Sequence, residues 1–290
     1  MSILLIGANG QVGWEVASQA GGQGIPLTGL AREQLDITNR AAVAEAVDNL
    51  RPSIIINAAA YTAVDKAERE PEQAFAVNRD AACHLVAACN KHNIPLVHIS
   101  TDYVFDGNKA SPYDEGDQAN PLNVYGQSKL AGEQVIRDAL ARHLIIRTSW
   151  VFGSHGQNFV KTVLRLAKKG GPLRIVDDQS GAPTSASSIA RCILDLAKNY
   201  NEHGDLPWGT YHFSCSRLAT WFGFAREIVA LASAIGLIEP VDIHPIATAE
   251  FPTPAKRPMD TRLATTRSLQ ILGCPARDWR LDLGLVIKSL

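Results

Sequence analysis

The stretch ILLIGANGQVG, residues 3–13, joins a short apolar run to three glycines with the spacing Gly7-x-x-Gly10-x-x-Gly13. The apolar run predicts a buried strand, and the following residues have the apolar spacing of a helix. In such a loop the first glycine permits a tight turn, the second lets backbone approach a pyrophosphate, and the third permits close packing of the helix on the strand. The free N–H groups at the helix start attract phosphate. The stretch therefore predicts a dinucleotide-binding fold, with a merely flexible turn as the alternative.

The end of the second predicted strand, IPLTGL, is where such folds usually carry a carboxylate for the adenosine ribose. This chain reads Leu30-Ala31-Arg32 there and has no carboxylate. Arg32 is suited to a 2′-phosphate, which favours NADPH over NADH without excluding NADH, and a solvated surface arginine is the alternative. Asp36 and Ile37 follow closely and are candidates for contact with the adenine ring.

Strand and helix patterns alternate through the first half of the chain. Apolar strands separated by helices indicate parallel strands covered on both faces, which is a doubly wound, Rossmann-like α/β fold. We expect an NAD(P)-binding domain at residues 1–150, with some later elements returning to the sheet, and a smaller substrate lobe at 151–290. Three local expectations are a helix over 38–50 with Thr38 as its N-cap, a long helix over 71–93, and an extended, proline-rich loop over 244–258.

The stretch VYGQSKLAGE, residues 124–133, places Tyr125 four residues before Lys129, on one face of a predicted helix. The spacing alone is more typical of an exposed amphipathic pair. Ketone reduction, however, needs a proton donor at the oxygen, and a neighbouring ammonium lowers the pKa of a phenol toward neutrality. Thr101 ends the predicted strand PLVHIST, and its hydroxyl could orient a carbonyl and stabilise a developing oxyanion.

The glycine loop, the strand-end threonine and the Tyr-x-x-x-Lys helix occur in this order with several further segments. These are GANGQVGWE, NAAAYTAVDKAE, STDYVFDG, NVYGQSKLAGE, RTSWVFG, NFVKTVLRLA, DDQSGAPT and TPAKRP. Together they resemble the extended short-chain dehydrogenase/reductase superfamily and, within it, the family of dTDP-4-dehydrorhamnose reductases over nearly the whole chain. Single motifs are widespread in the superfamily, whereas the ordered set is specific.

The resemblance implies an oxidoreductase in which Thr101, Tyr125 and Lys129 form the catalytic triad. Its reaction would be NAD(P)H-dependent reduction of the C4 ketone of a dTDP-linked 6-deoxy-4-ketohexose, dTDP-4-dehydro-beta-L-rhamnose, to dTDP-L-rhamnose. The product would serve cell-surface polysaccharide such as the O antigen of lipopolysaccharide. Lys129 would also hydrogen-bond the nicotinamide ribose.

Two sets of binding residues follow from the motifs and the resemblance. The cofactor set is Gly7, Gly10, Gln11, Val12, Gly13, Arg32, Asp36, Ile37, Ala60, Tyr61, Thr62, Tyr125 and Lys129. The substrate set is Thr101, Asp102, Tyr125, Trp150, Asn158, Gln179 and Arg257. Arg257 is suited to a diphosphate. Plain helix–sheet packing at 57–62, a core role for Trp150 and surface positions for the polar residues are the alternatives, and the roles of Asp102 and Glu115 stay open.

Composition excludes several classes of protein. A net charge of −1 over 290 residues gives no reason to expect nucleic acid or a membrane surface as partner. The chain has neither an apolar run of membrane-spanning length nor a basic leader. Five cysteines without a CxxC spacing predict reduced thiols in a cytoplasm, with no disulfide framework and no metal site. A homodimer is left open.

Two other functions share the same fold. A nucleotide-sugar dehydratase or epimerase regenerates its cofactor in each turnover, but Asp102-Tyr103 lacks the Asp-Glu pair that the dehydratases use after the threonine. A non-catalytic, cofactor-binding regulatory subunit, like the one related to methionine adenosyltransferase, would not need an intact triad. Stoichiometric consumption of NADPH with a ketosugar separates these functions from a reductase.

Overall fold

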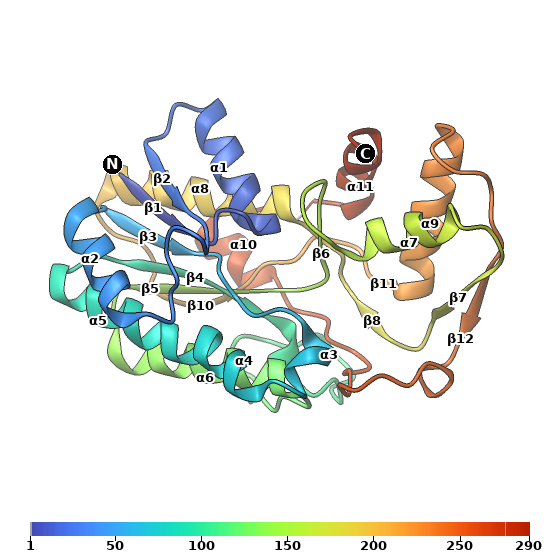
Figure 1. Cartoon of the computed structure of the whole chain (residues 1–290), viewed down its shortest axis with the longest axis horizontal. Coiled ribbons are helices and arrows are strands. Elements are labelled where there is room, and N and C mark those ends of the chain that lie inside the picture. Colours follow the sequence, from blue (N-terminus) through green and yellow to red (C-terminus); the bar gives the residue numbers. More distant parts are fainter. Residues whose placement is uncertain (1, 276) are drawn as a thin grey trace.

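A six-stranded parallel sheet forms the centre of the computed structural model, which describes residues 2–275 and 277–290 (Figure 1). The strand order is β10-β5-β4-β3-β1-β2. The strands are β1 (Ile3–Ile6), β2 (Leu27–Leu30), β3 (Ile54–Asn57), β4 (Leu96–Thr101), β5 (His143–Thr148) and β10 (Gly209–His212). The predicted doubly wound parallel α/β fold is confirmed, and the second half of the chain supplies β10.

Helices cover both faces of this sheet. Figure 1 shows α1 (Gln11–Gly22) and α8 (Ala186–His203) on one face and α2 (Arg40–Leu50), α5 (Ala81–His92) and α6 (Val124–Ala139) on the other. Strand β1 contributes to both layers, because Ile3 and Leu5 pack toward α1 and α8 while Leu4 and Ile6 pack toward the opposite helices. Burial on both faces explains why these strands are continuously apolar instead of alternating.

Two predicted helices differ from expectation in detail. Helix α2 begins after Asn39, whose side chain accepts hydrogen bonds from the backbone N–H groups of Ala41 and Ala42. The prediction of Thr38 as N-cap is wrong, because its hydroxyl instead donates to Asp36 at 2.8 Å. The helix predicted over 71–93 is present as α4 (Pro71–Phe75), a π-helical turn η1 (Ala76–Asp80) and α5.

A second hydrophobic core lies in the C-terminal half. Helices α7 (Phe159–Ala167), α9 (Trp221–Ala234) and α11 (Trp279–Lys288) pack around Phe152, Phe224 and Trp279. Strand β7 (Leu173–Val176) pairs in parallel with β12 (Ile243–Ile246). The loop predicted over 244–258 is therefore wrong at its start, where residues 244–246 belong to β12. Ile243 packs on this second core and Ile246 is buried, which holds the segment as a strand.

Short elements connect these layers. They are α3 (Val64–Ala67), the 3₁₀ turn η2 (Asp102–Val104), β6 (Val151–Phe152), β8 (Ser180–Gly181), β9 (Thr184–Ser185), β11 (Ala219–Thr220), the 3₁₀ turn η3 (Thr248–Glu250) and α10 (Thr266–Leu272). Of the helices in residues 2–275 and 277–290, none has the length and apolar character needed to cross a bilayer.

One cysteine pair contradicts the expectation of five reduced thiols. Cys192 on α8 and Cys274 after α10 form a disulfide, with Cα atoms 5.4 Å apart. The two residues are 82 positions apart in the sequence, so only the tertiary fold brings them together. Cys83, Cys89 and Cys215 are free thiols.

Candidate active site

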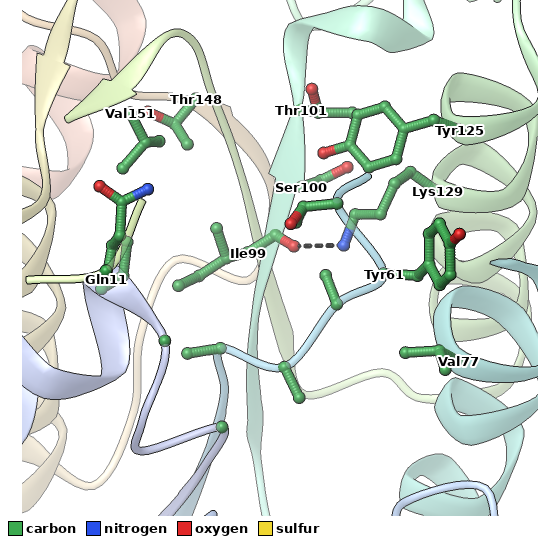
Figure 2. A pocket seen from close by; sticks show the side chains of 18 of the residues that line it. Gln11, Tyr61, Val77, Ile99, Ser100, Thr101, Tyr125, Lys129, Thr148 and Val151 are labelled. Carbon is green, nitrogen blue, oxygen red and sulfur yellow. Dashed lines mark hydrogen bonds between the residues drawn. The ribbon is translucent and has the colours of Figure 1, made fainter. Parts of the chain in front are cut away.

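A cleft of about 740 Å³ opens at the carboxyl ends of the sheet strands, where parallel α/β folds bind ligands (Figure 2). The glycine turn, the loop after β2 and the turn after β3 line one part of it, and the end of β4, the start of α6 and the segments after β5 line the rest. The predicted residues that line it are Gly7, Gly10, Gln11, Val12, Arg32, Asp36, Ile37, Ala60, Tyr61, Thr62, Thr101, Asp102, Tyr125, Lys129, Trp150 and Asn158.

The glycine turn has the tight geometry of a phosphate-binding loop. Gly7 has φ +82°, and a Cβ there would lie 2.6 Å from the backbone nitrogen of Ala59. A Cβ on Gly13 would lie 2.1 Å from the carbonyl oxygen of Gly7, so only glycine lets α1 approach β1 this closely. Gly10 is the N-cap of α1, whose free N–H groups face the cleft end of the sheet. These residues fit a dinucleotide pyrophosphate.

The loop after β2 offers both charge and an apolar surface. Arg32 and Asp36 are exposed at the cleft, whereas Ile37 is buried beneath it. The hydroxyl and the backbone N–H of Thr38 lower the pKa of Asp36, so this carboxylate is ionised and already engaged at neutral pH. Arg32 is therefore the side chain of this loop suited to an additional phosphate.

Tyr125 and Lys129 both reach the cleft from α6. The side chain of Asn123 accepts a hydrogen bond from the N–H of Gly126, which starts the helix directly beside the cleft. A Cβ at Gly126 would lie 2.2 Å from the carbonyl oxygen of Tyr103, so glycine allows α6 to approach the turn that carries Thr101 and Asp102. Figure 2 shows the Tyr125 ring beside Thr101, with Lys129 below it. Lys129 Nζ donates to the carbonyl oxygen of Ile99 at 2.7 Å.

The sequence predicted that the Lys129 ammonium lowers the pKa of Tyr125, but the structure gives this phenol a raised pKa. Burial raises the pKa of Tyr125 to about 12, a hydrogen bond with Thr101 lowers it, and the Asp102 charge raises it. Burial also lowers the pKa of Lys129 to about 8, while the Glu133 charge raises it. The chain therefore holds Tyr125 as a protonated phenol, which is the form that a proton donor needs.

Asp102 is a buried carboxyl group at the cleft. Its Oδ1 accepts from the Thr101 hydroxyl at 3.1 Å, and its Oδ2 has no partner among the residues that the structure describes. Burial raises the pKa of Asp102 to about 7, with the hydroxyls of Thr261 and Thr101 opposing the shift. The second oxygen of this buried carboxyl group is thus left without a hydrogen bond from the described residues.

We expect Asp102→Asn to change how stability depends on pH. A pKa raised above that of the unfolded chain means that the folded protein binds the extra proton between about pH 4 and pH 7. Stability of the parent therefore falls as pH rises through this window, and Asn removes that fall. Denaturant unfolding at several pH values checks this, and parallel pH profiles for both proteins would contradict it.

Trp150 and Asn158 join the second half of the chain to the cleft. Trp150 has φ +47° and stacks on Trp221 with ring centroids 3.5 Å apart. Asn158 caps α7 and donates to the side-chain oxygen of Gln11 in the glycine loop at 2.9 Å. The two side chains therefore give the cleft an aromatic surface and an amide.

Gln179 and Arg257 are not among the residues that line the cleft. Gln179 accepts from Trp221 Nε1 at 3.2 Å and donates to Thr248 at 3.0 Å. Arg257 makes a two-fold ion pair with Asp65, at 3.0 and 2.8 Å. The described part of the structure thus does not bring these two side chains to the cleft surface.

Several site residues were missed by sequence reasoning. Tyr103 and Trp221 line the cleft. Beneath it, Glu133 on α6 is fully buried and pairs with Arg147 of β5, and His98 of β4 lies against Lys129. The sequence KLAGE could have indicated Glu133, because this residue lies four positions after Lys129 on the same helix face.

The fold and the cleft together define an NAD(P)-dependent oxidoreductase of the extended short-chain dehydrogenase/reductase class. A family model described as the RmlD substrate binding domain matches residues 1–290. The chain belongs to this family, that of the dTDP-4-dehydrorhamnose reductases, which confirms the resemblance inferred from its motifs.

Individual relatives agree over their full lengths. The dTDP-4-dehydrorhamnose reductase of Sinorhizobium fredii is 41% identical over 96% of this chain and 94% of its own length. That of Escherichia coli K12 is 40% identical over 100% of this chain and 98% of its own length. The crystal structure of the Bacillus anthracis enzyme in complex with NADP superposes with a TM-score of 0.92 at 34% identity, covering 100% of both chains.

Proposed function

We propose that this chain reduces the C4 ketone of dTDP-4-dehydro-beta-L-rhamnose to dTDP-L-rhamnose for cell-surface polysaccharide, and that it uses NADPH at least as well as NADH. The observation that carries this proposal is one cleft that joins a phosphate-binding glycine turn to the Thr101, Tyr125 and Lys129 side chains. The names of the full-length relatives supply the substrate, and the NADP complex of the Bacillus anthracis enzyme supports the cofactor.

The residues of the chain divide the work of ketone reduction. A bound reduced nicotinamide supplies the hydride. Tyr125 holds a proton on its phenol oxygen and donates it to the ketone oxygen as charge develops there. Thr101 would offer its hydroxyl to the same oxygen, and its hydrogen bond to Asp102 would then have to open. Lys129 lies below Tyr125 (Figure 2), where it would hydrogen-bond the nicotinamide ribose.

We propose that the glycine turn, Gln11, Val12, the loop with Arg32, Asp36 and Ile37, and the segment Ala60 to Thr62 hold the cofactor. For the sugar we propose Trp150 as a stacking surface and Asp102 as an acceptor for a hydroxyl. Asn158 and Gln179 belong to the lobe of residues 151–290 that would bind the nucleotide. Arg257 stays our candidate for the diphosphate because it lies beside Tyr103, and its pair with Asp65 would then have to open.

We expect Arg32→Ala to raise the Michaelis constant for NADPH more than that for NADH. The reason is that only NADPH carries the 2′-phosphate, and a charge-assisted hydrogen bond from arginine to phosphate contributes about 1.5–3 kcal/mol. Initial rates with each cofactor at saturating ketosugar measure the two constants. Equal changes for both cofactors would show that Arg32 is only a surface residue.

The function is tested by comparing the dTDP-linked 4-keto-6-deoxy sugar with the free sugar in a spectrophotometric assay. Binding of the remote nucleotide should hold the ketone in place, so we expect the free sugar to be a very poor substrate. Cofactor consumed in equal amount with the conjugate supports the reductase. Conversion of the sugar without net consumption of cofactor would favour an epimerase or dehydratase. Cofactor binding without conversion of the sugar would favour a regulatory subunit. Comparable rates with the free sugar would exclude a nucleotide-sugar enzyme.

The setting of the reaction is also part of the proposal. We place it in the cytoplasm, where cells keep NADPH and nucleotide sugars, with neither nucleic acid nor a membrane as partner. A homodimer is the assembly we propose, and sedimentation analysis of the purified chain tests it.

A further inference from the structure

A chain of hydrogen bonds runs from the backbone of the β3 turn to Lys129. The N–H of Ala59 donates to Asn57 Oδ1 at 3.1 Å, and Asn57 Nδ2 lies 3.0 Å from His98 Nδ1. His98 Nε2 in turn lies 3.3 Å from Lys129 Nζ. Asn57, His98 and Lys129 are each 2% exposed, so no bulk water competes for these contacts.

The N–H of Ala59, at the start of this series of hydrogen bonds, determines which atom is the donor in each later contact. A peptide N–H can only donate, so the carbonyl oxygen of the Asn57 amide must face Ala59 and its NH₂ group must face His98. His98 therefore accepts at Nδ1. A neutral imidazole that accepts at Nδ1 carries its proton on Nε2, which is the nitrogen that faces Lys129.

We infer that Asn57 and His98 form a tautomer lock that presents an N–H group to Lys129 and thereby disfavours its ammonium form. An ammonium has three donors and no acceptor, so it cannot accept the Nε2–H of His98. A neutral amine can: one N–H donates to Ile99, the lone pair accepts from His98, and one N–H remains for the cleft. His98 is a positioning residue in this scheme, since it acts through Lys129.

The charges around the lock are consistent with this arrangement. Burial and the Lys129 charge hold the pKa of His98 well below its usual value, so the imidazole is neutral. Glu133 is the anion that favours the Lys129 ammonium, but both its oxygens are engaged by Ser100, Arg137 and Arg147. Burial already lowers the pKa of Lys129 to about 8. The lock therefore acts on a lysine that is close to losing its proton at neutral pH.

The consequence of the tautomer lock for catalysis rests on the proposed function, whereas the Nε2–H tautomer of His98 does not. After Tyr125 has given its proton to the ketone oxygen, it is a phenolate and must recover one proton. A destabilised Lys129 ammonium is a stronger acid, so a proton leaves Nζ more easily to restore the phenol. The neutral amine that remains is the form that the Nε2–H of His98 stabilises.

The test measures the tautomer and the lysine separately on the full chain without cofactor. Long-range ¹H–¹⁵N correlation spectra of ¹⁵N-labelled protein distinguish the two neutral tautomers, and His98 is assigned by its contacts with the Asn57 amide. We expect the Nε2–H tautomer at pH 7. The Nδ1–H tautomer or an imidazolium at this residue would overturn the inference, and this measurement requires no variant.

His98→Gln then removes the lock, because an amide can turn its oxygen toward Lys129. We expect the titration midpoint of Lys129, followed through its ¹³Cε signal, to rise by about 0.5–1 pH unit, the equivalent of one hydrogen bond of ordinary net strength. In the reductase assay the alkaline limb of the kcat profile should move to higher pH by a similar amount.

His143→Gln is the matched control, because His143 is also a buried histidine on a sheet strand but its Nδ1 contacts the carbonyl oxygen of Leu140. It should leave the Lys129 midpoint unchanged. An unchanged midpoint in His98→Gln would overturn the inference. If the NMR results are as expected but the protein reduces no ketosugar, the tautomer lock is supported and only the proposed function is overturned.

Discussion

Replacing Tyr125 by phenylalanine is expected to lower kcat at least about 100-fold, because general acid catalysis is usually worth that much. The ring itself stays, so the edge-on contact with Tyr103, at 5.8 Å between centroids, is kept. Cofactor affinity should therefore be nearly unchanged. Steady-state kinetics with the dTDP-ketosugar and fluorescence titration with NADPH measure the two quantities.

The control for this variant is Tyr200→Phe, which removes a phenol hydroxyl on α8 that contacts Arg142, outside the cleft. We expect it to leave kcat at the parent value. If Tyr125→Phe kept near-parent turnover, Tyr125 would not be the proton donor.

Arg147→Met is expected to destabilise the fold by about 3–5 kcal/mol, because it leaves a buried carboxylate without its main partner. Glu133 is fully buried and accepts from Arg147 at 2.9 and 2.7 Å. Arg137, which is a third exposed, also contacts it but cannot supply the same desolvated pair. Urea unfolding at pH 7 measures the loss.

The double variant with Glu133→Gln and Arg147→Met should recover much of this stability, since no charge is then left uncompensated. Equal stability of the single and double variants would contradict this reading. Burial raises the pKa of Glu133, but the contacts with Arg147 and Ser100 more than offset it and leave the pKa lowered. The stabilisation is therefore present above the unfolded pKa and is lost as pH falls through the folded one.

Local sequence signals predicted the fold and most of the side chains that line the cleft. The glycine spacing, the apolar strands and the Tyr125-x-x-x-Lys129 helix each depend on residues that are near one another in the chain, so their geometry follows from strand and helix periods. The cleft contains sixteen of the predicted residues because the carboxyl ends of parallel strands meet at one end of the sheet.

Features that depend on contacts between distant segments were not predictable. The pair of Arg257 with Asp65 spans 192 positions, and the Cys192–Cys274 disulfide spans 82. His98 reads in the sequence as one more residue of a buried strand, and only the structure shows Lys129 above it and Asn57 beside it. The start of α2 was missed for a local reason, because the Thr38 hydroxyl donates to Asp36 and Asn39 caps the helix instead.

The position of β10 has a consequence for how the chain folds during synthesis. Strand β5, whose six residues are all buried, pairs with β4 on one side and with β10 on the other. Until residue 212 has left the ribosome, β5 is an unprotected edge with open backbone hydrogen-bonding groups, which is a template for aggregation. The first half of this protein therefore depends on the second for its solubility while it is being made.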